Sequence, residues 1–234
     1  RIQFRMLNRS KGPAVWGPRA QCDRAMYPIA VRRILDELPM LDLFQEMVDD
    51  VLLEGGRGRV VGVRTRGGLV FGARCVVVTT GTFLRGRIHV GGEAGVEAGR
   101  AGEAPSVALA ESLEGLGLEV ARFKTGTPPR VDGRTVDFAR TERQDGDPDP
   151  YRFAVYAQEV VLEQRPCWIT YAGDGLKAVV RDNLHRSALY GGEIAGRGPR
   201  YCPSIEDKIV RFPDAPGHQV FLEPEGLQTT ELYV

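Results

Sequence analysis

The sequence predicts an α/β chain in which a β-meander leads into a buried strand and an α+β segment is inserted later. Short apolar segments between residues 43 and 80 indicate consecutive strands, and the unbroken apolar run over 75–78, which continues into small residues, indicates a strand buried on both faces. Near residue 124 the sequence becomes rich in turn-forming and charged residues, which indicates a domain boundary. The helices of this α/β chain are predicted from two segments in which apolar residues recur with helical periodicity.

These two segments, residues 23–38 and 105–116, repeat apolar side chains at the spacing of one buried helix face. Asp23 is a suitable N-cap for the first helix, and Pro28 stands where it can shift the start. Gly117 follows the second helix as the residue expected to end it in the left-handed conformation.

We expect strands over 43–48, 51–54, 60–66, 69–71 and 74–80, and another over 118–123. Gly67-Gly68 predicts a two-residue hairpin loop, because glycine enters positive-φ turns without steric cost. The run from Cys75 is expected to be a parallel strand whose carboxyl end, at Thr80-Gly81-Thr82, meets a ligand. A tight packing turn at this end explains the small residues equally well.

The later part of the chain is predicted to be an inserted subdomain. It should contain strands within 151–171, a helix over 176–184 and a glycine-rich return over 191–199. We therefore expect three divisions: residues 1–125, 126–198 and 199–234.

Composition excludes several classes of protein. The 234 residues carry 31 basic and 31 acidic side chains, so a polyanion site must be local and does not cover the whole surface. No run approaches the ~18 apolar residues of a membrane span. The four cysteines form no CxxC pair, which indicates free thiols and a cytoplasmic chain. The ends, at Arg1 and inside an apparent strand at Val234, suggest a fragment.

Metal and phosphate motifs are weak. His89, His185 and His218 are isolated from other metal-ligating residues, so no metal site is expected. GxGxxG is absent, and its nearest match, residues 173–178, lacks both the last glycine and a convincing preceding strand. We do not expect that segment to bind phosphate.

Cys202 is the thiol that most suggests chemistry. It precedes a short helix that Ser204 can cap, and it lies near Arg200 and Lys208, features that lower a thiol pKa. It is either a nucleophile or, as free cysteines commonly are, a half-buried packing residue. The other three cysteines, Cys22, Cys75 and Cys167, are interpreted as packing residues.

A basic stretch later in the chain has two interpretations. Its cations are either solvated loop charges or a track for RNA phosphates. They are Arg122, Lys124, Arg130, Arg134, Arg140 and Arg143.

Five segments together resemble the MnmG (GidA) family, the flavoprotein subunit that modifies the wobble uridine of certain tRNAs. The resemblance covers the whole chain in the family's order, and its longest block is residues 198–212. The five segments are residues 6–16, 79–84, 124–130, 198–212 and 221–227.

The resemblance implies part of a glutathione-reductase-like FAD/NAD(P)-binding Rossmann-type domain, interrupted by an insertion that contributes to NADH binding. It also implies a homodimer and a complex with the GTPase MnmE. With methylene-tetrahydrofolate as one-carbon donor and glycine or ammonium as amine donor, that complex adds an aminomethyl or carboxymethylaminomethyl group to uridine C5 in tRNA.

The family's site residues carry over by position. Val48 and Ser106 match FAD contacts, and the Thr80-Gly81-Thr82 turn is expected to belong to the same cofactor site. Cys202 matches one of two functionally implicated cysteines, whose thiolate would attack uracil C6. The expected NAD-contacting segment comprises Gly198, Pro199, Arg200, Tyr201, Cys202, Pro203, Ser204, Ile205, Glu206, Asp207, Lys208, Ile209, Val210, Arg211 and Phe212.

Three alternatives stay open. A folate- and FAD-dependent tRNA uridine methyltransferase shares the flavin fold but lacks the 198–212 block. A non-catalytic tRNA-binding or dimerisation fragment is the alternative outside enzymes. A flavin disulfide reductase would need a close cysteine pair, which the sequence lacks. In the family the GxGxxG motif and the other cysteine precede the position of Arg1, so we expect this chain alone to bind FAD weakly or not at all.

Overall fold

The computed structural model describes residues 1–56, 58–91, 95–148, 152–153, 162–192 and 204–234. The chain divides into two compact units. The first comprises residues 1–41, 126–181 and 203–234, and the second comprises residues 42–125 and 182–202.

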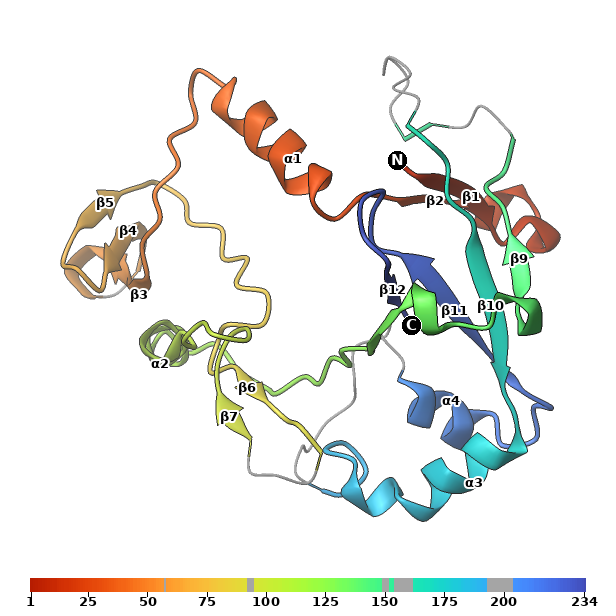
Figure 1. Ribbon diagram of the computed structural model, residues 1–234. Helices are drawn as coiled ribbons and strands as arrows, with labels where there is room; N and C mark the ends of the chain where they lie inside the picture. The colour runs from red at the N-terminus through yellow and green to blue at the C-terminus, as the bar shows by residue number, and fades with distance from the viewer. Residues whose placement is uncertain (57, 92–94, 149–151, 154–161, 193–203) are drawn as a thin grey trace. The chain divides into compact units, whose positions relative to one another are not determined.

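The first unit is built on a five-stranded sheet with the order β8-β12-β11-β10-β9, in which every neighbouring pair is antiparallel (Figure 1). Its core includes Ile169 of β10 and Leu222 of β11. The strands are β8 (Arg130–Asp132), β9 (Glu142–Gln144), β10 (Cys167–Ala172), β11 (His218–Pro224) and β12 (Glu231–Tyr233).

A separate hairpin in this unit, β1 (Gln3–Leu7) and β2 (Gly17–Gln21), occupies a region in which no strand was predicted. It is anchored by side chains of its first strand. Phe4 is buried, and the buried thiol of Cys167 donates a hydrogen bond to the Gln3 side chain over 3.2 Å. Cys167 is only 1% exposed, which confirms its interpretation as a packing residue, and this burial raises the pKa of its thiol to about 11.

Helix α1 (Met26–Asp36) confirms the position of the first predicted helix but not its buried face. The Asp23 carboxylate accepts hydrogen bonds from the backbone N–H groups of Ala25 and Met26, which explains the start. No residue of α1 is buried, and Ile34 is 56% exposed, so the predicted burial is wrong. Periodicity identifies an amphipathic helix, but burial needs a packing partner as well.

Two more helices lie in the part of the chain expected to be the insertion and the return. Helix α3 (Asp174–Asp182) confirms the helix predicted over 176–184, starting two residues earlier. Strand β10 directly precedes it, so the statement that residues 173–178 lack a preceding strand is wrong. Helix α4 (Ile205–Arg211) has Ser204 as its N-cap, as predicted.

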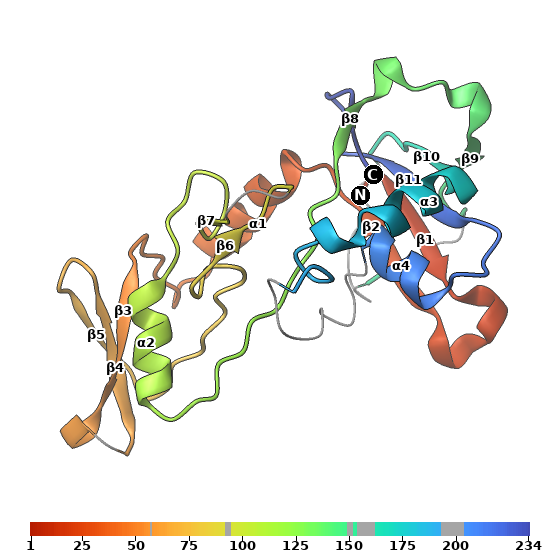
Figure 2. The same ribbon diagram turned by 90° about the horizontal axis from the view of Figure 1, so that it is seen from below.

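The second unit contains a three-stranded antiparallel sheet, β3-β4-β5, with helix α2 (Val107–Gly115) packed on it (Figure 2). Val51 of β3 meets Leu109 and Leu113 of α2 in a small core. The strands are β3 (Val48–Leu53), β4 (Val60–Thr65) and β5 (Val70–Gly72), with a further two-stranded ribbon of β6 (Arg87–Ile88) and β7 (Val96–Glu97).

Two glycines with positive φ shape this unit, one after α2 and one in the β4–β5 turn. Gly117, at φ +87°, ends α2 as predicted: its N–H donates to Glu114 O, and the next N–H, of Leu118, donates to Leu113 O. Between β4 and β5, the Thr65 N–H donates to Leu69 O and encloses a turn of three residues, 66–68, so the predicted two-residue loop is wrong. Gly68 alone adopts positive φ there, as a type I turn followed by a left-handed residue requires.

Several predicted strands do not form. Residues 43–47, 74–80 and 118–123 have no strand assignment, and Val77 is 85% exposed. Cys75 is also exposed, so its interpretation as a packing residue is wrong. An apolar run forms a buried strand only where neighbouring strands supply backbone partners, and the described residues pair no strand with 74–80.

Short 3-10 helices connect these elements: Arg9–Lys11, Pro13–Val15, Glu54–Gly56, Gly133–Thr135, Phe138–Arg140 and Leu184–Arg186. Of the predicted strands within 151–171, β10 is described, whereas residues 151 and 154–161 lie outside the described residues. Among the residues that are described, no helix has the length and apolar character needed to cross a bilayer.

Candidate functional site

The structure brings three of the predicted cofactor residues together around the start of α2. Thr80 O accepts a hydrogen bond from the Phe83 N–H, and Gly81 takes a positive φ of 56°, which makes the predicted turn. Phe83 O then accepts the N–H of Ser106 over 2.8 Å. Backbone hydrogen bonds through Phe83 therefore connect the Thr80-Gly81-Thr82 turn to the N-cap of α2.

The hydroxyl of Ser106 is the most informative atom of this region. Ser106 is only 4% exposed, and its Oγ is buried without a hydrogen-bond partner among the described residues. It caps α2 in extended conformation but makes no side-chain capping bond. A buried hydroxyl without a hydrogen-bond partner destabilises the folded chain. A ligand oxygen at this helix start could accept the missing hydrogen bond from the Ser106 hydroxyl.

The remaining two predicted FAD-site residues, Thr82 and Val48, both contact other parts of the same unit. The Thr82 hydroxyl donates to Gly99 O over 2.6 Å, which ties the turn to the segment before α2. Val48 begins β3 and packs, partly buried, against the core of Val51, Leu109 and Leu113. Its backbone is the part that the resemblance assigns to FAD, and the packing explains how that backbone is held.

The predicted NAD-contacting segment is described only from Ser204 onward. There the Ser204 side chain and Asp207 form a reciprocal capping box at the start of α4, while Ile209 is buried. Residues 198–203, including Cys202, lie outside the described residues. The described part, 204–212, belongs to the unit of the five-stranded sheet, whereas Val48, Thr80 to Thr82 and Ser106 belong to the other unit.

The basic stretch singled out in the sequence contains mostly engaged cations. Arg130 pairs with Glu225, Arg134 with Asp132 and Arg143 with Asp145, and the guanidinium of Arg134 holds the pKa of Asp132 far below its usual range. In the second unit, Arg122 donates to Arg85 O. Compensated charges favour the loop-charge interpretation of these residues over a phosphate track.

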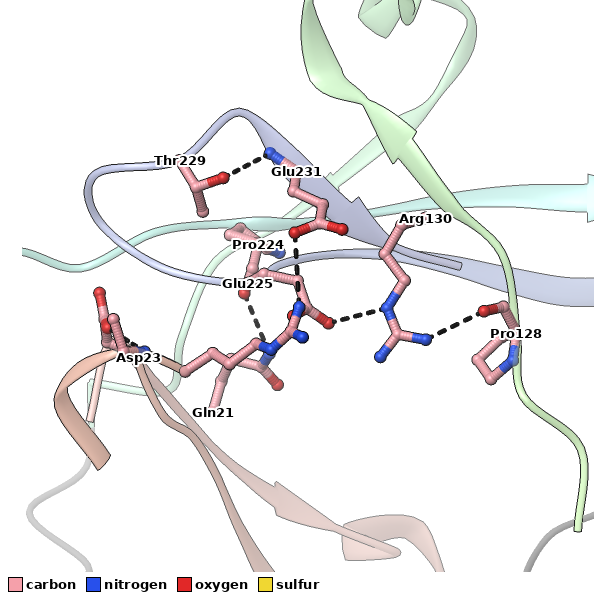
Figure 3. Close-up of polar contacts among 10 residues, drawn as sticks. Gln21, Asp23, Pro128, Arg130, Pro224, Glu225, Thr229 and Glu231 are labelled. Carbon is pink, nitrogen blue, oxygen red and sulfur yellow. Dashed lines mark hydrogen bonds and ion pairs between the residues drawn. The ribbon is translucent and has the colours of Figure 1, made fainter. Parts of the chain in front are cut away.

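Sequence reasoning missed a polar cluster that joins the β2–α1 connection to the turn after β11 (Figure 3). Glu225 is 8% exposed and is shared by two arginines: Arg24 Nη1 lies 2.8 Å from Oε2, and Arg130 Nε lies 3.3 Å from Oε1. The Arg24 N–H donates to Glu225 O, and Gln21 Nε2 donates to Pro224 O. Residues 221–227 form one of the five segments that resemble the family, but the sequence of that segment does not reveal the ion pairs that Glu225 makes.

A shallow depression of about 260 Å³, largely open to solvent, lies beside this cluster. Two of its charged lining residues are ion-paired with residues of the cluster: Arg130 with Glu225, and Glu231 with Arg24. The lining residues are Arg130, Val131, Asp132, Thr229, Thr230 and Glu231. The described residues contain no group of three or more His, Cys, Asp or Glu side chains placed to hold a metal ion.

Comparison with solved structures identifies the fold. Two crystal forms of Aquifex aeolicus GidA match with TM-scores of 0.86 and 0.83 at 47% and 42% sequence identity. Each match covers 99% of this chain, and 39% and 37% of the respective GidA chain. The predicted α/β fold class, a partial FAD/NAD(P)-binding Rossmann-type domain with an insertion, is confirmed at the level of this fold.

Comparison of sequences identifies the family. The family model described as "Glucose inhibited division protein A" matches residues 1–234, so the chain belongs to that family. Two curated relatives, from Thermodesulfovibrio yellowstonii and Heliobacterium modesticaldum, are both called "tRNA uridine 5-carboxymethylaminomethyl modification enzyme MnmG". Each is 52% identical, over 99% and 100% of this chain respectively. The chain spans 37% and 36% of their lengths, and the predicted family is confirmed.

Proposed function

We propose that this chain is part of an FAD- and NADH-dependent enzyme of the cytoplasm that modifies C5 of the wobble uridine in tRNA. The names of the relatives support the tRNA uridine substrate. The rest of the proposal comes from the family resemblance: action as a homodimer with the GTPase MnmE, methylene-tetrahydrofolate as one-carbon donor, and addition of an aminomethyl or carboxymethylaminomethyl group.

The observation that carries the proposal is the unpartnered hydroxyl of Ser106 at the start of α2. The residues present fit a flavin nucleotide at this position, because a buried donor and the first N–H groups of a helix suit its phosphate or hydroxyl oxygens. Ser106 would donate to the cofactor, the Thr80-Gly81-Thr82 turn would bring its backbone close, and Val48 would contribute backbone from β3. When bound, FAD would supply two-electron redox chemistry.

Two further roles complete the proposal. Residues 198–212 would contact NADH, with the capping box of Ser204 and Asp207 fixing the start of α4. Cys202 would act as the nucleophile toward uracil C6. Addition of the thiolate to C6 leaves an enolate with carbanion character at C5, which bonds to the electrophilic one-carbon unit. Loss of the C5 proton to solvent and departure of the thiolate from C6 then restore the C5–C6 double bond.

A chimera tests the proposal in a complete enzyme. The matching segment of Aquifex aeolicus GidA would be replaced by this chain, and wobble nucleosides would be analysed by mass spectrometry in cells that lack their own enzyme. Modified uridine is expected. Absence of modification from a folded chimera that binds flavin would contradict the proposal. Cys202→Ser should abolish modification while bound flavin is retained, and Cys75→Ser, at an exposed thiol, is the matched control.

A further inference from the structure

The β1–β2 hairpin ends in an ordered tip, residues 8–16, which we call the hairpin tip. Two 3-10 turns, Arg9–Lys11 and Pro13–Val15, fold it back on itself. Asn8 Nδ2 donates to Val15 O, and the Lys11 N–H donates to Asn8 O over 2.9 Å. These bonds hold the tip in one conformation, so its side chains are presented at defined positions.

The charge of this hairpin is positive and only partly compensated. The first acidic residue of the chain is Asp23, and before it stand Arg1, Arg5, Arg9, Lys11 and Arg19. The carboxylate of Asp147 is shared by two of these arginines, at 3.8 Å from Arg5 and 3.6 Å from Arg9. Lys11 is exposed and has no ion pair among the described residues. Unlike Arg134 or Arg143, it therefore carries an uncompensated charge.

An aromatic ring accompanies this charge. Trp16 is 38% exposed, and its indole Nε1 already donates to Arg9 O within the tip. With that polar atom satisfied, the exposed part of the side chain is ring surface. An uncompensated cation and an exposed aromatic ring on one hairpin tip are the combination by which proteins hold single-stranded nucleic acid, through phosphate contacts and base stacking.

We propose that the hairpin tip is an RNA-contact element, in which Lys11 and Arg9 meet phosphates and Trp16 stacks on an unpaired base. The inference rests on the proposed function, since that function makes the substrate a tRNA with an unpaired anticodon loop. Arg19 is paired with Glu223, so the hairpin charge left without an ion pair among the described residues lies on the tip, at Lys11. RNA is favoured over a protein partner because this remaining charge is positive. It is favoured here over the stretch from Arg130 to Arg143 because three arginines of that stretch are ion-paired.

Binding of a fluorescently labelled anticodon stem-loop to the 234-residue chain tests the first half. Lys11→Gln should weaken binding several-fold and should reduce the slope of log affinity against log salt by about 0.7 to 0.9, the value for one lost phosphate contact. Arg140→Gln is the matched control. Arg140 is also an exposed cation without an ion pair in the described part of the chain, but it lies in the other basic stretch. Its affinity and slope should stay unchanged.

Trp16 tests the second half. Trp16→Ala should weaken binding roughly 5- to 150-fold, the range that corresponds to one lost base–aromatic stack, and Trp16→Phe should recover most of it. The chain has two tryptophans, so Trp168→Phe leaves Trp16 as the sole tryptophan, which can be excited selectively over the tyrosines. Its fluorescence should fall when RNA is added.

Three results would overturn the inference: wild-type affinity in both Lys11→Gln and Trp16→Ala, no salt-dependent RNA binding by the chain, or a loss in Arg140→Gln equal to that in Lys11→Gln. These outcomes are separable from failure of the proposed function. Loss of uridine modification in the chimera with normal RNA binding would remove the proposed function alone, whereas normal modification with an insensitive hairpin tip would remove this inference alone.

Discussion

The carboxylate of Asp23 occupies the space that a side chain at position 226 would need. A Cβ on Gly226 would lie 2.8 Å from Asp23 Oδ2. That oxygen accepts the Leu227 N–H over 2.7 Å, while Oδ1 accepts the N–H groups of Ala25 and Met26. One buried carboxylate thus joins the start of α1 to the turn after β11, and the glycine next to Glu225 makes that approach possible.

Gly226→Ala should therefore destabilise the first unit. Three hydrogen bonds fix the Asp23 carboxylate, so it cannot move away from the new methyl group without losing them. We expect a loss of about 1 to 3 kcal/mol in the free energy of unfolding, measured by urea denaturation. Gly115→Ala is the control, because nothing lies within 4 Å of a Cβ there and α2 should gain up to about 1 kcal/mol. Equal stability of Gly226→Ala and wild type would show that the contact is not tight.

Asp23 should also make stability depend on acid pH. The hydrogen bond from Leu227, and then that from Met26, lowers the pKa of Asp23 below its ordinary 3.8. The unfolded chain therefore binds this proton more tightly than the folded chain. The stabilisation is complete above pH 3.8 and is lost as the pH falls through the folded-state pKa.

Asp23→Asn should accordingly be less stable at neutral pH and should lose less of its remaining stability on acidification. Urea midpoints at neutral pH and near pH 3 measure both effects. Asp42→Asn serves as the control, because Asp42 is exposed. A wild-type acid dependence in Asp23→Asn would assign the acid sensitivity to other carboxylates.

Glu225→Gln should weaken the link between β8 and the β2–α1 connection. The substitution removes a buried negative charge that serves both Arg24 and Arg130, although Arg24 is largely exposed and keeps Glu231 as a partner. We expect a cost of about 1 to 2 kcal/mol, detected as a lower midpoint of thermal unfolding. Glu37→Gln breaks the exposed pair with Arg33 and should cost less than about 0.5 kcal/mol. A similar effect of the two changes would argue against any special role of Glu225.

Ser106→Ala separates a ligand contact from a structural role. The hydroxyl has no partner in the described chain, so its removal should leave stability within about 0.5 kcal/mol of wild type or slightly higher. In the chimera the same change should weaken flavin retention several-fold, measured by absorbance after dialysis. Ser112→Ala is the control: it should destabilise, because the Ser112 hydroxyl accepts the Val51 N–H and donates to Asp50. Unchanged flavin binding in Ser106→Ala would remove Ser106 from the site.

Local signals in the sequence predicted the helices well and the strands less well. Asp23, Gly117 and Ser204 act within one turn of their own position, so their roles at helix ends could be inferred from the sequence. The run from Cys75 to Thr80 depends on strands that must come from elsewhere, and apolar character alone cannot supply them. The β1–β2 hairpin was missed because its strands contain arginines, glycine and proline that read as loop.

For the candidate site, too, local features could be predicted from the sequence, whereas contacts between distant residues could not. The helix start at Ser106 and the turn at Gly81 follow from sequence, and the structure adds that they are hydrogen-bonded through Phe83. The double use of Glu225 by Arg24 and Arg130 could not be inferred, because these residues are far apart in the chain and nothing local specifies their meeting.

The buried thiol of Cys167 gives this chain an internal chemical probe. Because the sulfur is shielded and its pKa is about 11, it should resist alkylation for as long as β1 stays against it, whereas the exposed thiol of Cys75 should label quickly. The labelling rate at Cys167, followed by peptide mass mapping, would therefore measure how often the N-terminal hairpin peels away from the sheet. The opening of the element proposed to contact RNA can thus be measured with a cysteine that the chain already contains.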